Sequence, residues 1–172
     1  RGGEGWVRCV LAGDICNGST IAKLAKRLTQ RWPEVDFIFL EGNHEMYFNR
    51  PDSVKVVIDA AVKKCPKFHA LSPGLTLELH GRRFIGATGW FHANFPSHLR
   101  HRISDFQAIK GFEPWVYSQH AAWVDWYAKQ GAPGDIVVMH YLPSWKSVAP
   151  EFARNALNCF FVCDIEDLIL KH

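Results

Sequence analysis

Short, mostly apolar runs alternate with amphipathic stretches along the chain. The runs stand at residues 6–12, 36–40 and 135–139, and each is followed by polar residues. Such runs are typical of strands that are buried on both faces. Between the first two runs, residues 21–28 repeat apolar side chains at helical spacing, and residues 53–65 do so after the second run. A proline follows each of these stretches and predicts the end of the helix.

The middle of the chain predicts a hairpin and a long loop. Residues 75–79 alternate, and residues 80–82 (HGR) turn the chain into residues 84–87, which is the pattern of a β-hairpin. We expect His80, in the turn, to be solvated. Residues 89–111 are rich in aromatic residues, His and Arg without a regular period, so we expect a functional loop with a short helix near residues 103–109.

Two further helices are predicted in the second half, at residues 114–130 and 165–170. The first has a proline in its opening turn and carries three tryptophans that we expect to pack in the core, namely Trp115, Trp123 and Trp126.

Strands that alternate with helices predict an α/β fold. The length of 172 residues fits one domain over residues 1–172, with its site at the carboxyl edge of the strands.

Composition and charge exclude several classes of protein. The apolar fraction of 48% indicates a folded globular chain. No apolar run reaches the roughly 18 to 20 residues of a membrane span, and residues 1–5 lack the apolar core of a signal peptide, so we expect a soluble, cytoplasmic protein. The 20 basic and 17 acidic residues are spread along the chain, and no basic arm for nucleic acid stands out. We therefore expect neither a membrane nor a nucleic acid as partner.

The five cysteines form no disulfide framework and no Cys-x-x-Cys pair. We expect reduced, mostly buried thiols. Cys159 and Cys163 lie one helical turn apart, a spacing that packing alone explains.

Three predicted strands end in residues that bind metals. Asp14 follows the first strand, Asn43 and His44 follow the second, and His140 follows the third. A carboxylate, an amide oxygen and imidazoles together suit borderline divalent metals such as manganese, iron or zinc. Each residue alone is weak support, because a polar residue after a strand is common, but their combination and order favour a metal site.

These residues stand in blocks that resemble the calcineurin-like metallophosphoesterase family. The family pattern runs Asp-x-His, Gly-Asp-x-x-Asp or Asn, Gly-Asn-His-Glu or Asp, a lone His after a strand, and Gly-His-x-His. Residues 13–17 (GDICN) match the second block, residues 42–45 (GNHE) the third and His140 the fourth. Residues 86–90 (GATGW) and 103–106 (ISDF) further resemble a bacterial subgroup of predicted phosphohydrolases.

The resemblance implies an αββα sandwich and a two-metal phosphoesterase that hydrolyses a phosphate mono- or diester of a small molecule. The reaction would be in-line attack of a metal-bound hydroxide on phosphorus. Asp14 would bridge two divalent ions, with manganese first and iron or zinc as alternatives, and Asn43 and His140 would bind the second ion. His44 would serve as general acid or donate a hydrogen bond to the phosphate, and Asn17 would orient its ring.

Other residues are candidates for substrate contacts. His92 follows GATGW, and Arg100 and Arg102 belong to a small cationic cluster that would attract an anionic substrate. Tyr141 follows the candidate ligand His140, at a place where many relatives carry a second His.

Two family blocks, Asp-x-His and Gly-His-x-His, have no counterpart in the sequence. We therefore expect a sandwich that is incomplete at both termini, with weak metal binding and with strand edges exposed. The alternative is a non-catalytic interaction module of the same fold with weak or no metal binding. A nuclease of the same superfamily would need a basic groove, for which the sequence gives no indication.

Overall fold

The computed structural model describes residues 7–172, and the strands of this part form two sheets. In the first sheet, β1 (Arg8–Ala12), β2 (Asp36–Leu40) and β3 (Phe68–Ala70) lie in this order and run parallel. In the second sheet, β4 (Leu77–Leu79) pairs antiparallel with β5 (Arg82–Ala87), and β5 pairs parallel with β6 (Ile136–Met139). Trp6, which we placed in the first strand, and residues 1–5 lie outside the described part.

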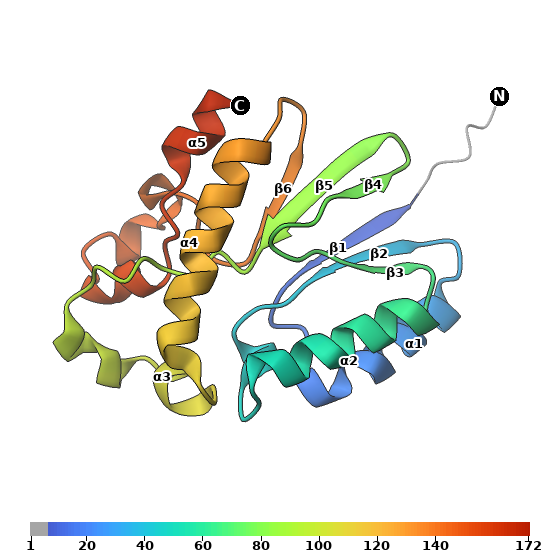
Figure 1. Cartoon of the computed structure of the whole chain (residues 1–172), viewed down its shortest axis with the longest axis horizontal. Coiled ribbons are helices and arrows are strands. Elements are labelled where there is room, and N and C mark those ends of the chain that lie inside the picture. Colours follow the sequence, from blue (N-terminus) through green and yellow to red (C-terminus); the bar gives the residue numbers. More distant parts are fainter. Residues whose placement is uncertain (1–6) are drawn as a thin grey trace.

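Helices cover the outer faces of the two sheets (Figure 1). The helices α1 (Ile21–Arg31) and α2 (Pro51–Lys64) share a core with Phe37 and Phe39 of β2. The long helix α4 (Phe112–Gln130) packs Trp123 and Tyr127 against Ile85 and Ala87 of β5. The alternate residues of these strands, including Ile38 and Phe84, form a third cluster between the sheets. Successive side chains of β2 and β5 thus point to opposite faces, one toward a helix layer and one toward the other sheet. The result is a sandwich of four layers, αββα.

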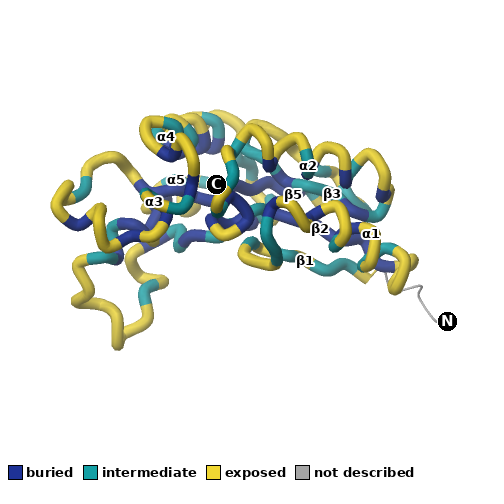
Figure 2. The backbone as a smooth tube through the Cα atoms, turned by 90° about the horizontal axis from the view of Figure 1, so that it is seen from below, coloured by how far each residue is buried: buried dark blue, intermediate teal, exposed yellow. Residues whose placement is uncertain are grey.

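The remaining helices are short. They are α3 (Asp105–Ala108), α5 (Glu166–Lys171) and the 3-10 turns η1 (Gly18–Thr20), η2 (His44–Met46), η3 (Ser97–Arg102), η4 (Trp145–Ser147), η5 (Pro150–Phe152) and η6 (Ala156–Phe160). Figure 2 shows the strands, mostly buried or half-buried, beneath α2 and α4, whose outer turns are exposed.

The predicted α/β fold and most of its elements are confirmed. The helix expected after residue 53 begins two residues earlier, with Pro51 in its first turn. The helix expected at Pro114 is α4, whose regular part begins there because Glu113 has an extended ψ of 139°. The hairpin turns at His80 and Gly81, which both have positive φ, as a two-residue turn between twisted strands requires. The last predicted helix is α5.

Residues 89–111, which we expected to form a functional loop, pack largely into the core, and α3 within them carries Asp105, which contacts Asn43. The aromatic side chains of this segment pack with one another and with Phe160, and Phe91 is fully buried. The irregular pattern of this segment therefore serves the core, within which α3 forms at the place of the predicted short helix. The strand β3 was not predicted, because three residues with a histidine in the middle give no period to recognise.

His80 is not solvated, contrary to our expectation. Its Nε2 lies 2.8 Å from Oδ2 of Asp36, which is buried at the start of β2. His69 of β3 and Lys67 contact the same carboxylate at 2.9 Å and 3.0 Å. This cluster joins the hairpin of the second sheet to the first sheet at the end opposite the candidate site.

Each sheet has two edge strands in the described part, β1 and β3 in the first sheet and β4 and β6 in the second. β1 pairs only with β2 there, and β6 pairs only with β5. Val10 of β1 is 44% exposed and Ile136 of β6 is 37% exposed, which is high for apolar strand residues. Both strands therefore leave an apolar side chain partly exposed.

The cysteines and tryptophans largely follow the prediction. All five cysteines lie within residues 7–172 and are free thiols, of which Cys65 and Cys163 are buried and the other three half-buried. Trp123 is fully buried, and Trp115 and Trp126 pack partly buried against the core. No helix in the described residues is both long and apolar enough to cross a bilayer.

Candidate metal centre

Three strand ends bring the candidate ligands to one place. Asp14 lies two residues beyond β1, Asn43 lies three beyond β2, and His140 follows β6 directly. The sandwich places β6 of the second sheet near β1 of the first, since Nδ1 of His140 lies 2.9 Å from the carbonyl oxygen of Ala12. Asp14, Asn43, His44 and His140 together line an open depression of about 310 Å³. The structure therefore gathers the four residues that the sequence singled out as strand-end ligands and acid.

The buried carboxylate of Glu45 holds the loops that carry these residues. Its two oxygens accept hydrogen bonds from the backbone N–H groups of Asp14, Ile15 and Cys16, at 2.9, 2.7 and 2.9 Å. A fourth N–H, that of Gly42, donates at 2.8 Å. One carboxylate thus fixes the loop after β1 against the loop after β2, and each bond to a charged acceptor is stronger than one to a neutral acceptor.

Two glycines let these loops approach. The backbone of Gly13 has a φ of +92°, and a side chain there would collide with the ring of His140. A Cβ on Gly42 would collide with Oδ1 of Asp14. Asp14 itself has a φ of +57°, a conformation that a short polar side chain tolerates.

The ring of His140 presents a metal-binding nitrogen to the depression. A carbonyl oxygen only accepts, so Nδ1 carries the hydrogen and donates it to Ala12. The other nitrogen, Nε2, faces Oδ1 of Asn43 at 3.1 Å and Oδ1 of Asp14 at 3.4 Å. Nε2 then carries a lone pair, and a lone pair repels the two oxygens that face it unless a cation lies among the three atoms. This donor set fits a divalent metal ion.

The carboxylate of Asp14 favours a proton on the ring of His140. Burial alone would lower the pKa of His140 and raise that of Asp14. Burial is the largest single effect, but the hydrogen bond between the two side chains, bonds with backbone groups and the nearby charges together outweigh it, so the pKa of His140 is raised and that of Asp14 is lowered. The N–H of His44, which donates to Oδ1 of Asp14 at 3.0 Å, also favours the carboxylate.

A second buried carboxylate, Asp105 of α3, orients the amide of Asn43. The amide nitrogen of Asn43 donates to Asp105 at 2.8 Å, which turns its oxygen toward His140. The hydroxyls of Tyr47 and Tyr141 donate to the same carboxylate at 2.8 Å and 3.0 Å. Burial and the nearby Asp105 raise the pKa of both tyrosines, which keeps them as donors. Tyr141 thus stabilises the carboxylate that orients the candidate ligand Asn43.

His44 is the exposed member of the group. Its side chain is 58% exposed, and Nε2 lies 3.7 Å from Oδ2 of Asp14. The ring stacks on Tyr47, with centroids 4.4 Å apart. An exposed imidazole beside the metal position can reach a bound phosphate ester.

The side chain of Asn17 is occupied at the start of η1. Its oxygen accepts from the backbone N–H and the hydroxyl of Ser19, at 3.0 Å and 2.9 Å. Its amide donates to the backbone oxygen of Tyr47 at 3.4 Å. Asn17 therefore reaches His44 only through Tyr47, on which the imidazole stacks, and its expected direct contact with the ring is replaced by this indirect one.

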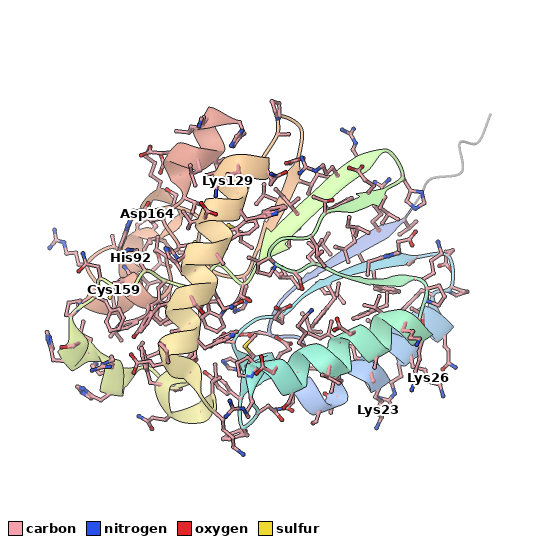
Figure 3. All side chains as sticks on the ribbon, viewed as in Figure 1. Lys23, Lys26, His92, Lys129, Cys159 and Asp164 are labelled. Carbon is pink, nitrogen blue, oxygen red and sulfur yellow. The ribbon has the colours of Figure 1, made fainter. Side chains whose placement is uncertain are left out.

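The three candidate substrate residues do not line the depression. His92 accepts a hydrogen bond from the backbone of Asn94, and Figure 3 shows it on the side of α4 away from β1 and β2. Arg100 pairs with Glu113 at 3.0 Å, and Arg102 is exposed on the same turn, η3.

The sequence reasoning missed the supporting residues Glu45, Asp105 and Tyr47. Glu45 was visible as the last residue of the GNHE block but received no role. Asp105 was visible in the ISDF block but received no role, because it lies 62 residues from the amide that it orients.

Comparison with known proteins places these residues in one family. The sequence model of the family described as calcineurin-like phosphoesterase matches residues 9–169, a range that contains all four residues of the depression. Neither the search of curated proteins nor that of solved structures gave a match. The match confirms the predicted family and its sandwich fold. The chain belongs to the calcineurin-like phosphoesterase family, whose members in general hydrolyse phosphate esters with the help of divalent metals.

Proposed function

We propose that the protein hydrolyses the phosphate ester of a small molecule at the depression formed by Asp14, Asn43, His44 and His140. The observation that carries this proposal is the convergence of two side-chain oxygens on Nε2 of His140, whose other nitrogen is committed to Ala12. The exposed ring of His44 lies at the rim of the same depression. Whether the ester is a mono- or a diester does not follow from these residues.

The proposed cofactors are two divalent ions, with manganese first and iron or zinc as alternatives. Such ions supply Lewis acidity toward the phosphoryl oxygens and lower the pKa of coordinated water. Asp14 would touch both ions, and Asn43 and His140 would hold one of them. Three protein donors fill only part of the coordination spheres of two ions, so we propose that ligands beyond those gathered in residues 7–172 complete the site.

The chain's own residues then position the reacting groups. Glu45 and Asp105 fix the ligand loops before the substrate arrives, so little reorganisation accompanies the reaction. His44 would donate a hydrogen bond or a proton to the leaving oxygen, with Tyr47 holding its ring and Asn17 holding the backbone of Tyr47.

Manganese-dependent hydrolysis of an aryl phosphate and of a bis-aryl phosphodiester tests this function in the protein expressed from its full gene. We expect turnover with Mn²⁺, its loss with chelator, and its loss in Asp14→Asn and His44→Ala. The matched controls are Asp125→Asn and His98→Ala, which change exposed residues of the same kinds on α4 and η3. A folded protein without metal-dependent turnover of either ester would refute the proposal.

The second candidate is a non-catalytic interaction module of the same fold. One observation favours it: among residues 7–172, no three His, Cys, Asp or Glu side chains gather closely enough to hold a metal by themselves. Metal analysis of the purified full-length protein separates the two candidates. Stoichiometric Mn²⁺, Fe or Zn supports the enzyme, and a metal-free folded protein that does not take up added Mn²⁺ supports the module.

A further inference from the structure

A larger cavity lies away from the metal centre, between α2, α4 and the segment that joins β3 to β4. Figure 1 shows α2 and α4 on either side of this connection. The cavity has a volume of about 400 Å³, which is within the range of small-molecule sites. Its walls are partly apolar and include Met46, Val54, Ile58 and Trp115. No residue of the depression at Asp14 and His140 lines it, so the two sites are separate.

An acidic group at the end of β2 faces this cavity. Glu41 lines it, and within the described residues the only hydrogen bond to its carboxylate comes from its own backbone N–H. Asp52 adds a second carboxylate to the lining. Lys55 also lines the cavity, but its ammonium lies 3.4 Å from Oδ1 of Asp59 on the next turn of α2. Burial raises the pKa of Glu41 to about 7, so its carboxyl group has unused acceptor capacity and a bound cation would favour its charged form.

The inner end of the cavity is aromatic and contains an unused donor. A narrow extension shares Glu41 and Trp115 with the main cavity and continues to Trp90 and Trp123. Trp123 is fully buried, and its indole N–H has no hydrogen-bond partner among residues 7–172. Buried donors without partners are rare in folded proteins, and the extension, with a volume of about 10 Å³, has room for about one water molecule to accept this hydrogen.

We propose that this cavity binds a small organic cation, an ammonium or amidinium group on a compact apolar or aromatic body. The cationic group would donate hydrogen bonds to Glu41, where a charged donor and a charged acceptor bond more strongly than neutral groups. The body would lie against Trp115 and Ile58, whose aromatic and apolar surfaces suit it, and a cation is also attracted to the face of an indole ring. An anion would meet Glu41 and Asp52 and be repelled.

Three probes of one shape test the proposal on the unmodified protein: benzylamine, benzyl alcohol and benzoate. Binding is followed by ¹H–¹⁵N spectra of the indole groups, with the signals of Trp115 and Trp123 assigned from single Trp→Phe variants. We expect benzylamine to shift both signals in a saturable way, benzyl alcohol to bind about tenfold more weakly, and benzoate not to bind. Equal binding of all three probes, no binding of benzylamine, or shifts that leave both indoles unchanged would overturn the proposal.

A charge-removing variant then locates the cation. Glu41→Gln keeps the shape of the side chain, and we expect it to weaken benzylamine binding about tenfold while leaving benzyl alcohol unchanged. The control is Glu78→Gln, which removes an exposed carboxylate on β4, outside the cavity. Undiminished benzylamine binding in a folded Glu41→Gln protein would contradict the assignment. If this variant does not fold, the probe series on the unmodified protein decides.

Discussion

Two buried carboxylates, Glu45 and Asp105, position the candidate metal ligands from behind. Glu45 gathers four backbone N–H groups from the loops after β1 and β2. Asp105 accepts from Asn43 and two tyrosines. Both side chains are almost completely buried, and a buried carboxylate is tolerated only when its oxygens are satisfied in this way. These two residues therefore decide how rigid the site is before any ligand binds.

Replacement of Glu45 by Gln tests the first of these roles. The amide NH₂ of glutamine would face N–H donors, so at least one buried donor loses its partner. We expect the free energy of unfolding to fall by about 3 kcal/mol, measured by urea denaturation. The exposed control Glu78→Gln should change it by less than about 0.5 kcal/mol. Equal stabilities of the two variants would contradict the role given to Glu45.

Replacement of Asp105 by Asn tests the second role through metal binding. The variant keeps the size of the side chain, but its amide group no longer accepts on both sides and leaves the amide of Asn43 free to turn. We expect the affinity for Mn²⁺, measured by titration calorimetry on the full-length protein, to fall about 10- to 100-fold. Asp125→Asn on the exposed face of α4 is the control. An unchanged affinity in Asp105→Asn would show that Asn43 needs no support.

At the scale of elements, the two sheets are joined at both ends of their strands. At the carboxyl ends, His140 after β6 reaches Ala12 of β1. At the opposite ends, His80 of the hairpin and His69 of β3 meet at Asp36 of β2. Burial would raise the pKa of Asp36, but its bonds to His80, His69 and Lys67 lower it well below its usual range.

This cluster predicts a defined acid dependence of stability. Because the pKa of Asp36 is lower in the folded than in the unfolded chain, its contribution is fully present above the unfolded pKa of about 4. It is lost as the pH falls from there toward the folded pKa, at up to about 1.4 kcal/mol per pH unit. Between pH 5 and pH 2, the free energy of unfolding measured with denaturant should fall less in Asp36→Asn than in the unmodified protein. If it falls equally in the two proteins, Asp36 is not a source of the acid sensitivity.

The elements differ in how far the sequence predicts them. Strands β2 and β6 are continuous apolar runs, and α1 and α2 show a helical period, so local pattern is sufficient for them. The aromatic segment at residues 89–111 has no period because its side chains, such as Phe91, are buried from several directions in a cluster with α4 and Phe160. The bond between His80 and Asp36 spans 44 residues and depends on the sandwich itself, which no local pattern reveals.

For the whole molecule, the αββα sandwich explains why distant residues form one site. The parallel strands β1 and β2 deliver Asp14 and Asn43 at one edge, and the second sheet delivers His140 to the same edge. These candidate ligands were predictable because polar residues at carboxyl strand ends stand out in sequence. Glu45 and Asp105 stand in the GNHE and ISDF blocks, but their roles were not predictable, since these roles lie in contacts that only the folded chain creates.

The most direct test of the proposed metal centre is Mn²⁺ binding by the full-length protein. Equilibrium titrations are run in parallel on the unmodified protein, Asp14→Asn and Asp125→Asn. We expect the unmodified protein and Asp125→Asn to bind Mn²⁺ equally. In Asp14→Asn the affinity should fall by more than the about 10- to 100-fold expected for the supporting residue Asp105. If Asp14→Asn, correctly folded, binds Mn²⁺ as well as the control, the depression at Asp14, Asn43 and His140 is not the metal centre.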